Sequence, residues 1–215
     1  MASLNTIVEY TNELLDISQF SDYCPNGLQL QGKTEVQCLI GGVTASRDLI
    51  DAAIDAGADA ILVHQGYFWK GEQACITGMK YERIRRLIDA GLSLLAYHLP
   101  LDAHAEYGNN VQLARQMGFA IEGGFARHGA IDIACYGQLS EALSGTSLAG
   151  RLRTVLQREP LYIQGHDREI QRLGWCTGAA QGYIEEAAAL GNHFQESAAR
   201  MVVFFMILEV LGEIS

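Results

Sequence analysis

The hydrophobic pattern of residues 38–117 alternates between short apolar runs and amphipathic segments. The runs CLIGGVT, AILVH and LSLLAYH are typical of buried strands. Between and after them, SRDLIDAAIDAGA, MKYERIRRLIDAG and residues 109–117 repeat apolar positions at helical spacing, and Gly57, Gly91 and Gly118 mark their ends. Strand, helix, strand, helix, strand indicates two βαβ crossovers. We therefore predict an α/β fold with a largely parallel sheet flanked by helices.

The flanking segments have a weaker pattern. Ser3 is expected to cap an amphipathic helix, and the polar stretch SQFSDYCPNGLQLQG is expected to be an irregular surface loop. Beyond Gly118 we predict strands at IDIACYGQL, PLYIQG and IQRLGWCTG, and helices at SLAGRLRTVLQ and QGYIEEAAALG. A break at Gly123–Gly124 would divide a two-lobed subunit into residues 1–123, a βαβ lobe with the candidate ligands, and residues 124–215, a second α/β lobe with an atypical tail.

Composition and charge narrow the class of protein. The 215 residues carry a net charge of −10, which argues against non-specific binding to nucleic acid, because phosphate binding needs a basic face. Five scattered cysteines, never in CxxC spacing, indicate reduced thiols. The N-terminal segment has acids where a signal peptide needs bases, and the apolar run Met201–Leu211 contains Glu209 and is too short to span a bilayer. We expect a cytoplasmic protein with no membrane partner.

Three side chains form a candidate metal site. His64 follows one predicted strand, His98 follows the next, and Asp102 lies four residues later. Because ligands bind outside the carboxyl ends of parallel strands, we expect both histidines at the same edge of the sheet. Two imidazoles and a carboxylate suit zinc, iron, manganese, cobalt or nickel. A single histidine beside an apolar strand is more often structural, so the prediction depends on the combination.

Other candidates have simpler interpretations. His104 could orient Asp102 or be exposed in its loop. The glycine-rich stretch WCTGAAQG could offer backbone N–H groups to an anion, although close helix–strand packing explains it as well. Arg47, Lys70 and Lys80 could meet phosphates, but we interpret each as a solvated surface charge. The sequence shows no nucleophile elbow, so covalent catalysis has no support.

Several longer motifs carry a family resemblance. NGLQ, GGVT, ADAILVHQGYFWKG, AYHLPLDAHAEYGNN and GWCTGAAQGYIEEA occur in this order along the chain. Together they resemble the dinuclear-metal-centre hexamer family, whose members are often labelled GTP cyclohydrolase I type 2 homologues. The resemblance implies up to two divalent metal ions per subunit, inside a toroidal homohexamer of α/β subunits. His64, His98 and Asp102 match ligand positions of the family.

The chain departs from the family pattern in two places. Gln65 stands where the family has a second histidine, and an amide is a poor ligand for a transition metal. The late Gly-His-His-x-x-Glu segment is also altered. One alignment places Gly191, Asn192, His193 and Glu196 there, so that His193 and Glu196 would be ligands. The other treats the final GEIS as an earlier motif of the family, with the ligand segment missing.

Two functions from different classes remain open. The first is a metal-dependent hydrolase that acts on a small-molecule substrate through a metal-activated water. The second is a non-catalytic metal-binding oligomer that serves as a scaffold or regulator. Gln65 and the altered tail are departures from the family pattern, and they make the second function more favoured for this chain than for a typical member of the family.

Overall fold

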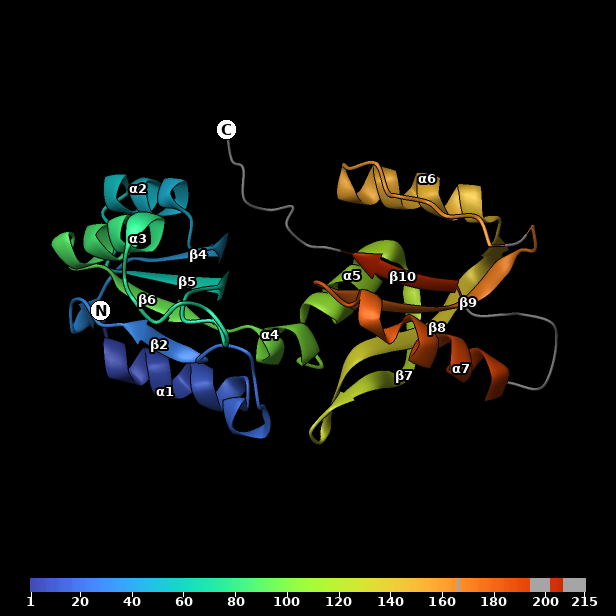
Figure 1. Ribbon diagram of the computed structural model, residues 1–215, viewed down its shortest axis with the longest axis horizontal. Helices are drawn as coiled ribbons and strands as arrows, with labels where there is room; N and C mark the ends of the chain where they lie inside the picture. The colour runs from blue at the N-terminus through green and yellow to red at the C-terminus, as the bar shows by residue number, and fades with distance from the viewer. Residues whose placement is uncertain (166, 194–201, 207–215) are drawn as a thin grey trace. The chain divides into compact units, whose positions relative to one another are not determined.

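The computed structural model describes residues 1–165, 167–193 and 202–206 (Figure 1). The chain divides into two compact units, the first made of Met1–Leu101 and the second beginning at Asp102. The division falls inside the short helix α4, Leu99–Ala103. The break that we predicted at Gly123–Gly124 is therefore misplaced, because both glycines lie within strand β7, Phe119–His128.

The first unit is built around a four-stranded sheet with the strand order β2-β6-β5-β4. Strands β4, β5 and β6 are parallel, as predicted, whereas β2 is antiparallel to β6. Strands β1 and β3 form a separate antiparallel pair. The elements of this unit are β1 (Ala2–Ser3), α1 (Leu4–Leu14), a 3-10 helix (Ile17–Gln19), β2 (Gly27–Leu30), β3 (Glu35–Val36), β4 (Leu39–Thr44), α2 (Arg47–Asp55), β5 (Ala60–Gln65), α3 (Gly78–Asp89) and β6 (Ser93–Ala96).

Serine side chains cap the N-termini of two of these helices, as the sequence predicted. The Ser3 hydroxyl accepts a hydrogen bond from the Thr6 N–H at 3.1 Å at the start of α1. The Ser46 hydroxyl accepts one from the Leu49 N–H at 3.2 Å at the start of α2. Each bond satisfies a backbone donor that has no partner within the first turn of a helix.

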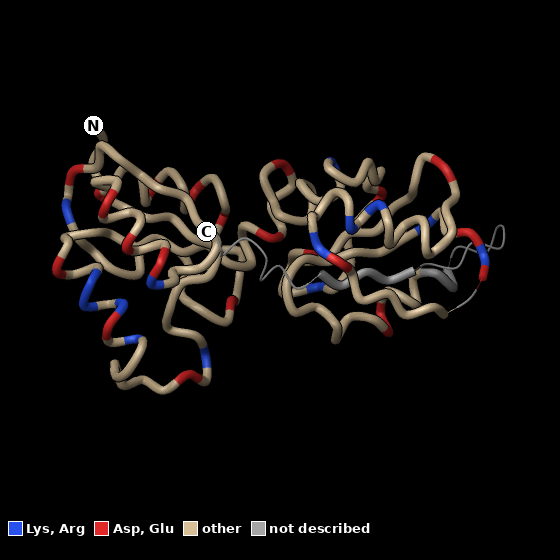
Figure 2. The backbone as a smooth tube through the Cα atoms, turned by 90° about the horizontal axis from the view of Figure 1, so that it is seen from above, with Lys and Arg blue, Asp and Glu red and all other residues tan. Residues whose placement is uncertain are grey.

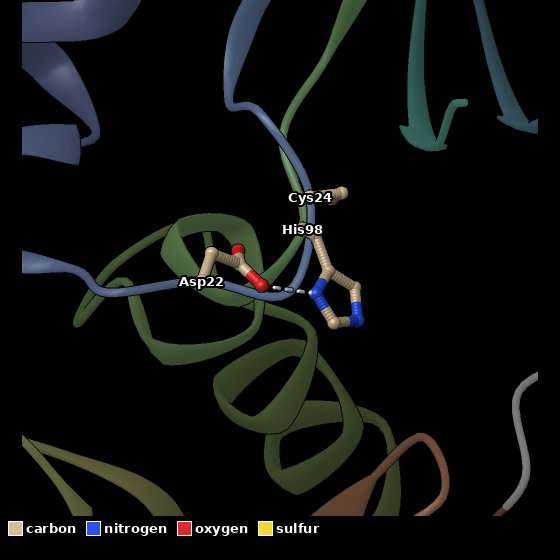
Figure 3. A group of neighbouring side chains, drawn as sticks. All are labelled: Asp22, Cys24 and His98. Carbon is tan, nitrogen blue, oxygen red and sulfur yellow. Dashed lines mark hydrogen bonds and ion pairs between the residues drawn. The ribbon is translucent and has the colours of Figure 1, made fainter. Parts of the chain in front are cut away.

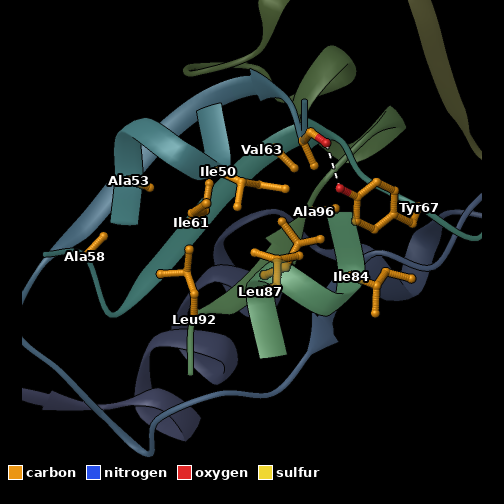
Figure 4. Packing of buried hydrophobic residues seen from close by; sticks show 12 residues of the cluster. Ile50, Ala53, Ala58, Ile61, Val63, Tyr67, Ile84, Leu87, Leu92 and Ala96 are labelled. Carbon is orange, nitrogen blue, oxygen red and sulfur yellow. Dashed lines mark hydrogen bonds between the residues drawn. The ribbon is translucent and has the colours of Figure 1, made fainter. Parts of the chain in front are cut away.

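Helices cover both faces of the first sheet, with α2 and α3 on one face and α1 on the other (Figure 1). Successive residues of β5 point to opposite faces. Ile61 and Val63 therefore pack against α2 and α3, in the cluster drawn in Figure 4, while Ala60 and Leu62 pack in the cluster that contains Leu4 of α1. This burial on both faces explains why AILVH is an unbroken apolar run.

The second unit contains a four-stranded sheet with the order β10-β9-β8-β7. Neighbouring strands are antiparallel from β7 to β9, and β10 is parallel to β9. Trp175 of β9 is 1% exposed and lies in a cluster with side chains of α5 and α6. Besides α4 and β7, the elements are α5 (Asn109–Met117), β8 (Ile131–Leu143), α6 (Gly145–Leu156), β9 (Ile170–Thr177), a 3-10 helix (Gln181–Tyr183), α7 (Ile184–His193) and β10 (Val202–Met206).

The structure corrects three expectations. The α/β class is right, but the sheets are mixed, and the second is mostly antiparallel because β7 and β8 form a hairpin with Gly129 at a φ of 67° in its turn. The segment PLYIQG is not a strand. Part of the expected surface loop forms β2, which Gly27 begins with a φ of 100°.

Charge is distributed throughout both units, with acidic and basic positions interspersed (Figure 2). All five cysteines are free, in agreement with the prediction of reduced thiols. Among the described residues no helix combines the length and the apolar character needed to cross a membrane.

We expect the Asp59 carboxylate to make stability depend on acid pH. Lys33 donates to it at 2.7 Å, and the backbone N–H groups of Gln37 and Cys38 donate at 2.9 and 3.2 Å. These bonds lower the pKa of Asp59 from 3.8 to about 2. Their stabilising effect is complete above the ordinary pKa and is lost as the pH falls toward 2.

Acid unfolding of Asp59→Asn tests this expectation. The variant should lose less stability than the wild type as the pH falls from about 4 to about 2, since it has no carboxylate to protonate there. The exposed Asp55 supplies the control variant, Asp55→Asn. Equal acid sensitivity of Asp59→Asn and the wild type would contradict the assignment.

Candidate metal centre

The ends of two parallel strands bring His64 and His98 together. His64 is the penultimate residue of β5, and His98 follows β6 after Tyr97. The centroids of the two imidazole rings lie 5.1 Å apart. His64 is only 8% exposed. The expectation that both histidines lie at one edge of the sheet is therefore confirmed.

Asp102 lies in α4, one helical turn after His98, so the short helix itself sets its position relative to that histidine. Its side chain is buried, with 3% exposed. Asn109 Nδ2 and Thr177 Oγ1 donate to Asp102 Oδ1 at 2.8 and 3.0 Å. His64, His98 and Asp102 each offer one ligand atom, and the three atoms lie within 4.8 Å of one another.

Hydrogen bonds determine which nitrogen of each imidazole can face a metal. His64 Nδ1 lies 3.0 Å from the carbonyl oxygen of Tyr97, and His98 Nδ1 lies 2.8 Å from Asp22 Oδ1. A carbonyl and a carboxylate accept but do not donate, so Nδ1 carries the proton in both rings. Nε2 is then the coordinating nitrogen of each histidine. This arrangement, in which Nδ1–H is held by an acceptor, is usual for metal-binding histidines.

Asp22 is the buried carboxylate behind His98 (Figure 3). Its side chain is 2% exposed. Burial alone would raise its pKa, but hydrogen bonds from His98, Asn26 and Leu99 hold the pKa of Asp22 below its ordinary value. The ionised form is therefore the stable one, and it fixes the ring of His98 from the side opposite Nε2.

The NGLQ motif explains how the segment before β2 reaches the site. Asn26 Nδ2 donates to Asp22 at 2.8 Å, and Asn26 Oδ1 accepts the N–H of His98 at 2.7 Å. Gln29 Oε1 accepts the N–H of Tyr67 at 2.7 Å, and Gln29 Nε2 donates to the Tyr67 carbonyl at 3.1 Å. Asn26 thus holds the backbone at His98, after strand β6, and Gln29 holds the turn that follows strand β5.

Sequence reasoning missed Asp22 as a site residue because the segment was interpreted as a surface loop. The composition of this segment nevertheless indicates a structural role. Asp22 and Asn26 are side chains that pair readily with backbone N–H groups, and they flank a cysteine and a proline in a segment without periodicity. What the sequence lacked was the fold that places this segment beside the end of β6.

Cys24 belongs to a second group of potential ligand atoms, with Asp22 and His98 (Figure 3). Burial, and then the charge of Asp22, raise the pKa of the Cys24 thiol to about 12. A metal binds the thiolate, which is scarce at neutral pH with such a pKa. Asp22 and His98 Nδ1 are moreover bonded to each other. This group therefore supports the His98 ring and is a poor candidate for a separate ion site.

The remaining predicted ligands are placed differently. Gln65 ends β5, and its Oε1 accepts a hydrogen bond from Thr44 Oγ1 at 3.2 Å. That contact ties the side-chain oxygen of Gln65 to the neighbouring strand β4. His193 is the last residue of α7, and its side chain is not described. Glu196 lies outside the described residues. Metal binding by these three stays a prediction.

The chain matches the profile of the family described as Duf34/NIF3 (NGG1p interacting factor 3) over residues 2–193. The chain belongs to this family. Two curated relatives are named "GTP cyclohydrolase 1 type 2 homolog". The protein from Pseudomonas aeruginosa is 50% identical over 189 residues, which cover 88% of this chain and 75% of that protein. The protein from Vibrio cholerae is 51% identical over 182 residues, with 84% and 72% covered.

Two solved structures share this fold. A structure described as "protein ybgI, unknown function" is 41% identical, has a TM-score of 0.84, and is matched over 88% of this chain and 75% of its own. TTHA1606 from Thermus thermophilus is 30% identical, has a TM-score of 0.76, and is matched over 86% and 74%. The family resemblance read from the motifs is therefore confirmed.

Replacing Asp22 should weaken metal binding without removing a ligand. In Asp22→Asn the acceptor for His98 Nδ1–H becomes a neutral amide, and we expect metal affinity to fall about 10- to 100-fold. Titration with Zn²⁺ against a chromophoric chelator measures the change. Asp16→Asn, in which an exposed acid is replaced, is the control. If Asp22→Asn binds Zn²⁺ as tightly as Asp16→Asn, Asp22 does not position His98.

Proposed function

We propose that this chain binds one divalent metal ion through His64, His98 and Asp102 and uses it to hydrolyse a small-molecule substrate. The observation that carries the proposal is the ligand geometry. Three ligand atoms lie within 4.8 Å of one another, and each histidine has its Nδ1 held by an acceptor. The donor set of two imidazoles and one carboxylate fits a zinc, iron, manganese, cobalt or nickel ion and matches that of catalytic zinc sites with an open position.

The chain's own residues prepare the site for such an ion. A bound divalent ion supplies a water molecule of lowered pKa and polarises a carbonyl or phosphoryl group. The Tyr97 carbonyl and the Asp22 carboxylate hold Nδ1 of the two imidazoles, which leaves Nε2 of each ring for the ion. Asn109 and Thr177 engage one oxygen of Asp102, which orients the carboxylate. Burial of His64 and Asp102 limits access of bulk water, which strengthens electrostatic interactions there.

A non-catalytic metal-binding scaffold is the second candidate. The side-chain oxygen of Gln65 is hydrogen-bonded to Thr44 and is therefore engaged within the protein. His64, His98 and Asp102 then form a ligand set for one ion, and the loss of a second ion favours the scaffold. Under either function we propose a cytoplasmic homo-oligomer, which the family resemblance implies to be a hexamer.

Metal analysis combined with a hydrolysis assay separates these functions. Purified full-length chain would be analysed for metal, treated with chelator, and then supplied with Zn²⁺ or Mn²⁺. Because the curated relatives are named GTP cyclohydrolase 1 type 2 homolog, GTP is the first substrate to test, followed by phosphoesters and cyclic amides. The hydrolase proposal expects activity that is lost with chelator and restored by metal. Bound metal without hydrolysis in any assay supports the scaffold, and absence of metal binding contradicts both.

A further inference from the structure

A small cavity lies beside the candidate metal centre, within the first unit. Its volume is about 220 Å³, and its walls include Thr44, Gln65, Tyr67, Trp69, Lys80 and Arg83. Pockets for drug-sized ligands have volumes of about 300–1,000 Å³. This cavity therefore suits a fragment of a ligand, such as one charged group with a few attached atoms. A larger depression of about 630 Å³, lined by Lys33 and Asp59 among others, lies at the opposite edge of the sheet from His64.

The cavity lies next to the site because of how β5 ends. His64 and Gln65 are consecutive residues, and Gln65 is in the wall. Trp69 is also in the wall, and the centroid of its ring lies 4.9 Å from that of His98. The turn that follows His64 therefore contributes residues to the cavity wall, and one of them, Trp69, also contacts His98.

Two cations, Lys80 and Arg83, and one carboxylate, Glu72, contribute to the walls. Within the described part of the chain, that carboxylate pairs with Lys80 alone. Lys80 Nζ pairs with Glu72 at 3.0 Å and lies 4.8 Å from the centroid of the Phe68 ring. The Lys80 side chain is only 13% exposed, so our interpretation of it as a solvated surface charge was wrong. Arg83 belongs to α3, and its Nε is buried without a hydrogen-bond partner among the described residues.

A buried guanidinium N–H without a partner is costly, and an anionic oxygen is its strongest partner. Gln65 adds a second donor to the same wall, because its Oε1 accepts from Thr44 and its Nε2 remains to donate. Arginine commonly holds carboxylate or phosphate through two parallel N–H bonds. The cavity thus combines one uncompensated cation, an amide donor and a volume for a single oxyanion group.

We propose that this cavity binds an oxyanion group, phosphate or carboxylate, through Arg83 and Gln65. The assignment of that group to the substrate of the metal centre rests on the proposed function, whereas anion binding itself does not. Gln65 then has a role in this chain that a histidine ligand at the same position would not supply.

Calorimetric titration of the full-length chain with inorganic phosphate and with acetate, at constant ionic strength set by NaCl, tests the proposal. We expect saturable binding of at least one anion, before and after metal is removed with chelator. Arg83→Lys keeps the charge but removes the planar guanidinium with its paired N–H donors, and affinity should fall about 10-fold or more. Arg85→Gln is the matched control, because Arg85 lies on the same helix in exposed pairs with Glu82 and Asp89 and should leave affinity unchanged.

Gln65→Leu gives a second test that does not depend on the folding of the Arg83 variant. This substitution should also lower the affinity for the anion. Tighter binding of phosphate or of acetate identifies which oxyanion the cavity takes. The proposal is overturned if the wild type binds neither anion, if Arg83→Lys binds as the wild type does, or if Arg85→Gln loses as much affinity. It is also overturned if chelator abolishes binding, since the anion would then sit on the metal. Anion binding by a chain that takes up no metal would instead refute the proposed function alone.

Discussion

Replacing His98 with alanine is expected to lower the affinity of the chain for divalent metal by more than about 100-fold. Loss of a residue that only orients a ligand costs about 10- to 100-fold, so loss of the ligand itself should cost more. His98 is also the residue on which Asp22 and Asn26 converge, through its Nδ1 and its N–H. Competition between the chain and a chromophoric chelator for Zn²⁺ or Co²⁺ measures the change.

His104→Ala is the control for this experiment. His104 Nδ1 accepts the N–H groups of Glu106 and Tyr107 at 3.1 and 3.0 Å, and its ring stacks on Tyr107 at 5.1 Å. These contacts give His104 a role in its own loop, so we expect metal affinity to stay at the wild-type value. Equal affinities of His98→Ala and His104→Ala would show that His98 is not a ligand.

Replacing Trp175 with alanine is expected to destabilise the second unit by about 3–5 kcal/mol, the usual cost of truncating a buried aromatic side chain. Among the residues whose burial the structure describes, Trp175 is the largest fully buried side chain. Its ring centroid lies 5.2 Å from that of Phe119, and its Nε1 donates to the Asn110 carbonyl at 3.0 Å. The substitution therefore leaves a cavity and removes the indole hydrogen bond to the Asn110 carbonyl.

Urea unfolding measures this loss as a shift of the transition midpoint. Ile163→Ala, in which a residue that is 80% exposed is truncated, is the control and should change stability by less than about 0.5 kcal/mol. Trp175→Phe should fall between the two, because it keeps most of the apolar volume and loses the indole donor. A Trp175→Ala midpoint equal to that of Ile163→Ala would contradict the placement of Trp175 in the core.

The sequence predicts the first sheet well because its local signals agree with its packing. Ser46, Gly57 and Gly91 mark helix ends, and the apolar runs of β5 and β6 match strands that are buried on both faces. It predicts the second unit less well. The long strand β7 contains Glu122 and two glycines, so its apolar alternation is interrupted, and its pairing with β8 depends on contacts distant in sequence.

For the site, the sequence places His64, His98 and Asp102 because all three follow strand ends in one βαβ region. It does not reveal Asp22 or Arg83. Asp22 acts on a residue 76 positions away in the chain, in a segment whose polarity resembles that of a solvated loop. Arg83 is one of several charges on an amphipathic helix, and only the fold shows that its Nε is buried beside a cavity.

The central claim is that His64, His98 and Asp102 hold one metal ion. The most direct test is a crystal structure of the metal-supplied chain with anomalous scattering data collected at the absorption edge of that metal. We expect one anomalous peak within about 2.0–2.2 Å of His64 Nε2, His98 Nε2 and an oxygen of Asp102. A peak beside Cys24 and Asp22 instead, or no peak at these three residues after saturation with metal, would contradict the claim.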